Sequence, residues 1–153
     1  MAGTGADVVS NGDSPAGPAM ISPAMYRQFA LPYEKKVLAE AHAAGLPYIL
    51  HICGDTTAIL DDIIGSGADG MELDYMTDVN VARDKMKGRL CFVGNIDPSG
   101  VLALGTVADV ERETARLIDL FDRTPRFILN AGCAIPPDTP SENIQAMIRI
   151  ARG

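Results

Sequence analysis

The order of the hydrophobic segments constrains the fold of this chain more than any other feature. Five short apolar segments each precede a longer stretch with the helical spacing of apolar residues, and no hairpin signal joins two of them. A strand followed by a helix, repeated in this way, is typical of a parallel α/β sheet. The predicted strands are residues 6–10, 47–53, 70–75, 90–96 and 126–131, and the predicted helices are residues 22–44 with an interruption near Pro32, 56–66, 79–87, 107–121 and 140–151.

Two architectures contain such units, a doubly wound sheet and a (β/α)8 barrel. A doubly wound nucleotide-binding domain carries a glycine-rich phosphate loop, and neither a GxGxxG nor a P-loop sequence is present. A complete barrel needs about 250 residues, whereas this chain has 153. We therefore expect an α/β domain over residues 1–153 that forms a partial (β/α)8 TIM barrel of about five βα units.

The charge and the cysteine content argue against several classes of function. The formal net charge is −7 and no run of Lys or Arg is present, so we expect neither nucleic acid nor an anionic membrane as a partner. No apolar run approaches the roughly 20 residues that span a bilayer, and residues 1–10 lack the pattern of a signal peptide. We expect a cytoplasmic protein, in which cysteines more often bind metal or take part in chemistry than form disulfides.

His51, Cys53 and Cys133 form a candidate metal site. Side chains alternate along a strand, so His51 and Cys53 point the same way at the carboxyl end of their predicted strand. Cys133 follows the end of the last predicted strand, and in parallel βα folds this edge carries the active site. One imidazole and two thiols suit zinc, and three protein ligands leave a position for a substrate. The residues alone leave a second interpretation open, in which Cys53 is a core cysteine beside a hydrogen-bonded histidine and binds no metal. Cys91, at the start of its strand, is interpreted as a small buried apolar residue.

Other predicted strands also end in polar side chains. Asp13, Asp74, Asn95 and Asp97 each lie at such an end, and Glu72 shares a strand face with Asp74. Asp and Asn commonly end strands and start turns, so each residue alone could have only a structural role. Four such residues on one edge favour a polar pocket that binds substrate beside the metal site.

Local signals mark where two of the helices begin. Asp55 is interpreted as a cap for the helix that starts near Thr56. For the last helix, Thr139 is the predicted cap, Pro140 suits the first helical position, and Glu142 completes the spacing of a capping box.

Several segments together resemble one protein family. His-Ile-Cys-Gly at residues 51–54, Gly-Asn-Ile-Asp-Pro at residues 94–98 and the stretch from Gly132 to Asn143 are similar to segments of the uroporphyrinogen decarboxylase superfamily. Residues 21–23 and 29–33 also look like that superfamily. The resemblance covers nearly the whole chain but only the C-terminal part of a family member. It implies a (β/α)8 barrel of which this chain is the C-terminal portion.

The resemblance separates two branches of that superfamily. The decarboxylases use no metal, whereas the corrinoid-dependent methyltransferases bind zinc through a His-x-Cys and a later Cys. The sequence looks like the methyltransferase branch because it carries His51, Cys53 and, after Gly132, Cys133. This branch implies that zinc activates a small thiol, which takes a methyl group from a methylcobalamin-type corrinoid held by a partner protein, with cobalt leaving as Co(I).

Three questions stay open at this point. The alternatives to the methyltransferase are a uroporphyrinogen decarboxylase and a zinc-binding fragment that is catalytically incomplete. The resemblance does not say whether the chain is active as an enzyme alone. The missing strands leave three explanations: a fragment of a longer gene product, a pairing with another chain or with a second copy that completes the barrel, or a degenerate remnant of the barrel.

Overall fold

The strands form one parallel sheet in the order in which they follow each other along the chain. The structure is a computed structural model, and it describes residues 5–121 and 126–153. Its sheet has the order β1-β2-β3-β4-β5, with every neighbouring pair parallel. The strands are β1 (Val9–Gly12), β2 (Tyr48–Ile52), β3 (Gly70–Leu73), β4 (Cys91–Ile96) and β5 (Phe127–Ala131).

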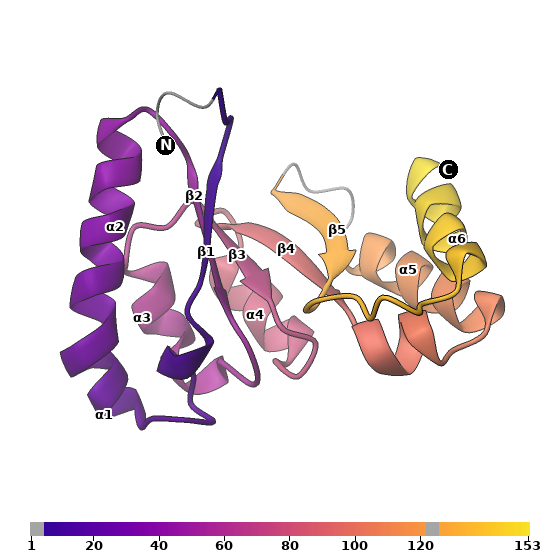
Figure 1. The fold of residues 1–153 in the computed structure, drawn as a ribbon, viewed down its shortest axis with the longest axis horizontal. Coiled ribbons are helices and arrows are strands. Elements are labelled where there is room, and N and C mark those ends of the chain that lie inside the picture. Colours follow the sequence, from indigo (N-terminus) through magenta and orange to yellow (C-terminus); the bar gives the residue numbers. More distant parts are fainter. Residues whose placement is uncertain (1–4, 122–125) are drawn as a thin grey trace.

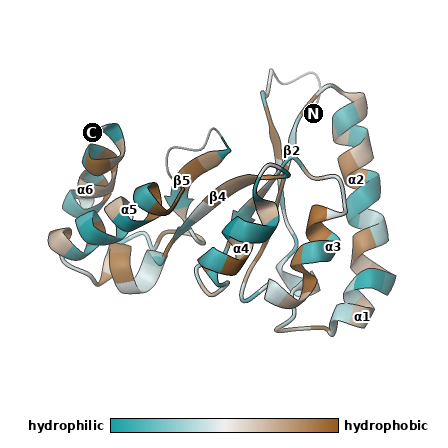
Figure 2. Cartoon of the chain, turned by 180° about the vertical axis from the view of Figure 1, so that it is seen from behind, coloured by the Kyte–Doolittle hydropathy of each residue, from teal (hydrophilic) through white to brown (hydrophobic). Residues whose placement is uncertain are grey.

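Helices connect the strands, as parallel pairing requires. In Figure 1 the helices lie along the outside of a curved sheet. They are α1 (Pro23–Met25), α2 (Leu31–Ala43), α3 (Leu60–Ile64), α4 (Val79–Met86), α5 (Val107–Phe121) and α6 (Ser141–Arg152), with short turns η1 (Ser14–Ala16), η2 (Tyr26–Ala30), η3 (Thr57–Ile59) and η4 (Pro98–Ala103). Figure 2 shows hydrophilic and hydrophobic colour alternating along the helices, as expected for helices with one covered face. In the part of the chain that the structure describes, no helix has the length and apolarity needed to cross a membrane.

The two faces of the sheet are different. Along β2 the residues alternate between buried and half-buried, with Tyr48, Leu50 and Ile52 on the buried side. Leu50 is in register with Met71, and Met71 with Phe92, so one apolar row crosses three strands beneath the helices. The opposite face carries the register row that joins His51, Glu72, Val93 and Ile128, of which Ile128 is 51% exposed. This open face corresponds to the interior of a barrel.

The open face explains why one prediction about a cysteine is wrong. Cys91 is the first residue of β4 and is in register with Gly70, which pairs with Ile49 of β2. It is half-buried and not a core residue. Its side chain belongs to the face that the described helices do not cover.

The first strand also differs from its prediction. Residues 6–10 were the predicted strand, whereas β1 runs from Val9 to Gly12. Asn11 and Gly12 have the sequence of a turn, but they pair in register with Leu50 and His51 of β2. Pairing with the neighbouring strand therefore outweighs the local turn preference.

The long first helix is interrupted where the sequence predicts, at a proline. A wide π-helical turn, η2, precedes α2, and Pro32 lies in the first turn of α2, where its missing N–H is tolerated. The predicted helix over residues 56–66 divides into η3 and α3, and its predicted apolar face, Ile59, Leu60, Ile63 and Ile64, is buried. Asp55 accepts a hydrogen bond from the Thr57 N–H at 2.9 Å, which agrees with its predicted capping role.

The predicted capping box of the last helix is wrong. Helix α6 begins at Ser141, after Pro140, and among the described residues no side chain caps it. The N-cap residue is Pro140, and its carbonyl accepts from the Asn143 N–H at 3.1 Å, as the N-cap carbonyl of a helix ordinarily does. The Thr139 hydroxyl is buried and has no partner among the described residues.

Asn143 joins α6 to the rest of the fold, and its replacement should be costly. The side chain is 2% exposed, and Nδ2 donates to the carbonyl oxygens of Leu102 and Gly105, both at 2.9 Å. In Asn143→Ala both carbonyls lose their donor, so we expect the free energy of unfolding to fall by about 2 kcal/mol in urea titrations. Gln145→Ala, on the exposed side of the same helix, should change it by less than about 0.5 kcal/mol. Equal losses for the two variants would contradict this role.

Candidate metal centre

Strand β2 presents two of the predicted ligands to the open face of the sheet. His51 is the fourth residue of β2 and Cys53 follows the strand, so both lie on the side opposite to Leu50 and Ile52. Both side chains are half-buried. The position of this pair follows from strand alternation, as predicted.

A close backbone contact brings the third predicted ligand to the same place. Cys133 follows β5, and the preceding Gly132 donates its N–H to the Ile96 carbonyl at 2.7 Å. A Cβ on Gly132 would lie only 2.5 Å from the Tyr75 nitrogen. Glycine at this position therefore lets the loop approach the end of β3 and carry Cys133 toward Cys53.

The mutual distances of the three donor atoms fit a tetrahedral zinc site. Cys53 Sγ lies 3.6 Å from Cys133 Sγ. His51 Nε2 lies 3.2 Å from Cys53 Sγ and 3.9 Å from Cys133 Sγ. With Zn–S bonds of about 2.3 Å and Zn–N bonds of about 2.0 Å, a tetrahedral site predicts about 3.8 Å between sulfurs and about 3.5 Å between nitrogen and sulfur. The observed distance between the sulfurs is close to the expected one. The two observed nitrogen–sulfur distances lie on either side of the expected nitrogen–sulfur distance, so the donor set fits zinc.

The imidazole of His51 is held in the orientation and tautomer that a metal ligand needs. Its Nδ1 lies 3.0 Å from the backbone carbonyl of Glu72, which can only accept, so Nδ1 carries the proton and Nε2 presents its lone pair. The Glu72 carboxylate lies 3.8 Å from Nδ1 and accepts from Asn130 Nδ2 at 2.9 Å. This chain of contacts links β5, β3 and β2 behind the ligand.

The two thiols have different surroundings, and their pKa values shift in opposite directions. A hydrogen bond from Ser14 lowers the pKa of Cys53 against the effect of burial, and contacts with His51 and Cys133 add to this lowering. Burial raises the pKa of Cys133, and the adjacent Cys53 thiolate raises it further. Burial also lowers the pKa of His51, but the hydrogen bonds to the Glu72 carbonyl and to Cys53 outweigh it, so this pKa is raised.

The structure brings together three of the four residues predicted to bind substrate, around two adjacent cavities, and Asn95 Nδ2 donates to the Asp74 carbonyl at 3.3 Å. Asp74 is 3% exposed and lines a cavity of about 460 Å³ together with Cys53 and Cys133, while Oδ1 accepts from the Met76 N–H at 2.9 Å. Asn95 and Asp97 line a neighbouring cavity of about 410 Å³. Asp97 Oδ1 accepts from the N–H groups of residues 99 and 100, both at 2.9 Å, so it also shapes its own turn.

Asp13 lies apart from the other three. It is half-buried between β1 and η1, and its N–H donates to the His51 carbonyl at 2.8 Å. Its backbone therefore helps to hold the end of β2. The single polar pocket that the sequence predicts is divided in the structure between two cavities and this turn.

Sequence reasoning missed several residues around the metal centre. Ser14 and Asn130 contact it through hydrogen bonds, and Met20, Tyr75 and Met76 line the cavity in front of the two thiols. Tyr75 and Met76 follow directly after Asp74, so the end of that strand was the available signal. The sequence held no signal for Ser14, because its contact with Cys53 joins residues that are 39 positions apart.

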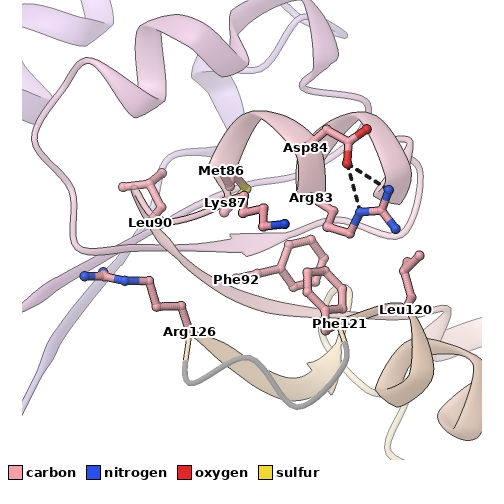
Figure 3. Close-up of a pocket in the computed structure, with 10 residues that line it drawn as sticks. Arg83, Asp84, Met86, Lys87, Leu90, Phe92, Leu120, Phe121 and Arg126 are labelled. Atoms are coloured by element: carbon pink, nitrogen blue, oxygen red, sulfur yellow. Dashed lines mark hydrogen bonds and ion pairs between the residues drawn. The ribbon is translucent and has the colours of Figure 1, made fainter.

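A further cavity lies away from this centre. It has a volume of about 370 Å³ and is bordered by α4, the start of β4 and the end of α5 (Figure 3). Phe92, Phe121, Lys87 and Arg126 are among its lining residues. The Arg83 guanidinium, also in the lining, is paired with Asp84 at 2.8 Å. It contains none of the predicted site residues.

Comparison with known proteins places the chain in a family. The family model described as Uroporphyrinogen decarboxylase (URO-D) matches residues 1–153. The chain belongs to the uroporphyrinogen decarboxylase family.

Its relatives include both kinds of enzyme that the sequence resembles. A methylcobamide:CoM methyltransferase, MtbA, of Methanosarcina mazei is 34% identical over 152 residues, and the MtbA of Methanosarcina acetivorans is 32% identical. A uroporphyrinogen decarboxylase of Syntrophotalea carbinolica is 33% identical over 148 residues.

The relatives are longer than this chain. The alignment with each MtbA covers 99% of this chain and 43% of the relative. A solved structure of a methyltransferase from Methanosarcina mazei matches with a TM-score of 0.85 and 28% identity, over 97% of this chain and 42% of that one. The prediction of a partial TIM barrel in the α/β class is confirmed.

The glycine that precedes Cys133 should be required for the geometry of the centre. In Gly132→Ala the added Cβ meets the Tyr75 backbone at 2.5 Å, so the loop must move outward. We expect the free energy of unfolding to fall by about 1–3 kcal/mol, the usual range for overpacking. Zinc affinity should fall as well, because the displaced loop carries Cys133. Gly88→Ala is the control: its Cβ would meet open space, and its φ of +72° means that the variant loses stability through backbone strain alone. We expect Gly88→Ala to keep wild-type zinc affinity, so zinc titration of both variants separates a displaced loop from a general loss of stability.

Proposed function

We propose that this chain supplies the zinc centre of an enzyme that transfers a methyl group from a methyl-corrinoid to a thiol. The observation that carries the proposal is the convergence of His51 Nε2, Cys53 Sγ and Cys133 Sγ at distances of 3.2–3.9 Å. The two MtbA relatives, which carry the name methylcobamide:CoM methyltransferase, support the same reaction class.

The three side chains would hold the metal, and the surrounding residues define its chemistry. Bound there, zinc would keep a substrate thiol as a thiolate at neutral pH. Two cysteine thiolates and a neutral imidazole balance the charge of the ion, so a bound substrate thiolate stays electron-rich. Glu72 maintains the neutral tautomer of His51 through its carbonyl.

The cavity in front of the thiols would receive the substrates. The substrate sulfur attacks the methyl carbon, a C–S bond forms, and the electron pair of the broken Co–C bond stays on cobalt as Co(I). Met20, Tyr75 and Met76 provide apolar walls of this cavity, and all three side chains are exposed. Asp74 is the best placed of the predicted substrate contacts, because it lines this cavity, and we retain Asn95, Asp97 and Asp13 as weaker candidates.

The remaining parts of the enzyme would come from outside these 153 residues. The chain spans about two-fifths of its curated relatives, so we propose that it forms the C-terminal portion of their barrel domain. The corrinoid would be carried by a partner protein, and the missing strands by the same polypeptide, another chain or a second copy. The net charge of −7 disfavours nucleic acid as a partner. We propose a cytoplasmic location, where thiols remain reduced.

A methylation assay tests this function directly. The 153-residue chain is loaded with zinc under reducing conditions and mixed with methylcobalamin and a small thiol such as coenzyme M. We expect zinc-dependent formation of the methyl thioether, followed by mass spectrometry and by the absorbance change of the corrinoid. Chelated protein should show the uncatalysed rate.

The alternatives predict different outcomes in the same experiment. Zinc binding without thiol methylation would indicate a catalytically incomplete fragment. Binding of a porphyrinogen by metal-free protein, with no zinc uptake, would indicate a uroporphyrinogen decarboxylase, the activity named for the Syntrophotalea carbinolica relative. The second result would overturn the proposal, and the first would show that methyl transfer needs the strands that lie outside these 153 residues.

A further inference from the structure

The turn η1 places a serine hydroxyl against one of the two thiols. Ser14 Oγ lies 2.9 Å from Cys53 Sγ and donates a hydrogen bond to it. The turn is held above β2 by the hydrogen bond from the Asp13 N–H to the His51 carbonyl at 2.8 Å. A Cβ on Gly17 would lie 3.0 Å from the Cys53 carbonyl oxygen, so glycine at the end of the turn permits this close approach. The backbone itself therefore positions the Ser14 hydroxyl.

The two cysteines are consequently not equivalent. Cys53 receives the side-chain hydroxyl of Ser14, whereas Cys133 has a backbone hydrogen bond from Ala134 and contacts with the other thiol at 3.6 Å and with His51 Nε2 at 3.9 Å. Both sulfurs line the cavity that would receive the substrates. A methyl donor that reaches this cavity therefore meets protein thiolates as well as the substrate thiolate.

We propose that Ser14 is a positioning residue that protects Cys53 from methylation and so directs the methyl group to the substrate thiolate. This inference rests on the proposed function. A hydrogen bond to a thiolate is strongest while the sulfur carries its full charge, and attack on a methyl carbon removes that charge. The bond therefore stabilises the Cys53 thiolate more than the transition state of its methylation, which slows that reaction.

Residue-resolved alkylation of the zinc-loaded 153-residue chain tests the inference, with iodomethane as the probe. In this reaction a C–S bond forms, the C–I bond breaks and iodide leaves with the electron pair, so no oxidant or reductant is needed. Peptide mass spectrometry gives the ratio of methylated Cys53 to methylated Cys133, and Cys133 serves as the reference in the same molecule. We expect Ser14→Ala to raise this ratio about 10-fold, the effect of losing one charge-assisted hydrogen bond.

Two further variants separate the hydroxyl from a general disturbance. Ser14→Thr keeps the hydroxyl and should restore a low ratio. Ser10→Ala removes an exposed hydroxyl from β1, in the same segment, and should leave the ratio unchanged. An unchanged ratio in Ser14→Ala, or an equal rise in Ser10→Ala, would overturn the role of Ser14.

Parallel measurements distinguish this failure from failure of the proposed function. Zinc content and thiol methylation are recorded on the same samples. Zinc-loaded protein that methylates a thiol but shows no change of ratio refutes only the role of Ser14. The opposite case is protein that binds zinc and methylates no thiol but shows a raised ratio in Ser14→Ala. That result refutes the methyltransferase function of this chain alone and retains the effect of the Ser14 hydroxyl on Cys53. Wild-type protein without zinc refutes both.

Discussion

Replacing Cys133 with alanine is expected to weaken zinc binding by more than about 100-fold. Residues that only support a metal ligand already contribute about 10- to 100-fold to affinity, and Cys133 supplies one of the two sulfurs themselves, 3.6 Å from the other. The loss also removes a negative charge that balances the ion. The measurement is a competition titration against a chromophoric chelator under reducing conditions, together with zinc content after dialysis.

The third cysteine of the chain is the matched control for this variant. Cys91→Ala removes a thiol of similar burial at the opposite end of the sheet, at the first residue of β4. We expect it to retain wild-type zinc content, whereas Cys53→Ala should behave as Cys133→Ala does. Unchanged zinc content in Cys133→Ala, or a wild-type protein without stoichiometric zinc, would refute the metal centre.

Replacing Phe92 with alanine should cause the largest loss of stability. Its ring is 1% exposed and lies 4.3 Å from the Phe121 ring and 5.9 Å from the Phe127 ring, centroid to centroid. Phe121 and Phe127 are themselves stacked at 4.4 Å, so Phe92 joins β4 to α5 and β5 through one aromatic cluster. Truncation of a buried Phe usually costs about 3–5 kcal/mol. The cavity of about 370 Å³ already borders Phe92 and Phe121, and removing the ring would enlarge it (Figure 3).

Urea unfolding followed by far-UV circular dichroism measures this effect. Phe29→Ala is the matched control, because it deletes the same atoms from a side chain that is 58% exposed, and it should cost less than about 1 kcal/mol. Phe92→Leu keeps most of the volume and should recover a large part of the loss. A cost for Phe92→Ala similar to that for Phe29→Ala would show that the cluster does not support the sheet.

Local rules predicted the parts of the centre that lie within one strand. Alternation along β2 places His51 and Cys53 on one face, and the order of βα units places Cys133 at the same edge. The distance between Cys53 and Cys133 did not follow from these rules. It depends on how closely the loop after β5 approaches Tyr75, and Gly132 determines that approach.

The predictions that were wrong also rested on local sequence patterns. Thr139 and Glu142 have the spacing of a capping box, but the N-cap position of α6 is Pro140, whose side chain has no oxygen that could accept a hydrogen bond. Asn11 and Gly12 have the sequence of a turn, but β2 offers them hydrogen-bond partners. For Asn11 and Gly12 a contact with a distant strand competed with a local preference worth about 1 kcal/mol and prevailed.

The sequence by itself determined the parallel α/β sheet, the identity of the three donor side chains and the edge of the sheet where they lie. These properties follow from periodicity, which acts within a few residues. Only the tertiary structure decided that the donors converge within 3.9 Å, that Glu72 orients His51 and that Ser14 contacts Cys53. The physical reason is that such contacts depend on the curvature of the sheet and on close backbone approaches at Gly17 and Gly132, which no local pattern encodes.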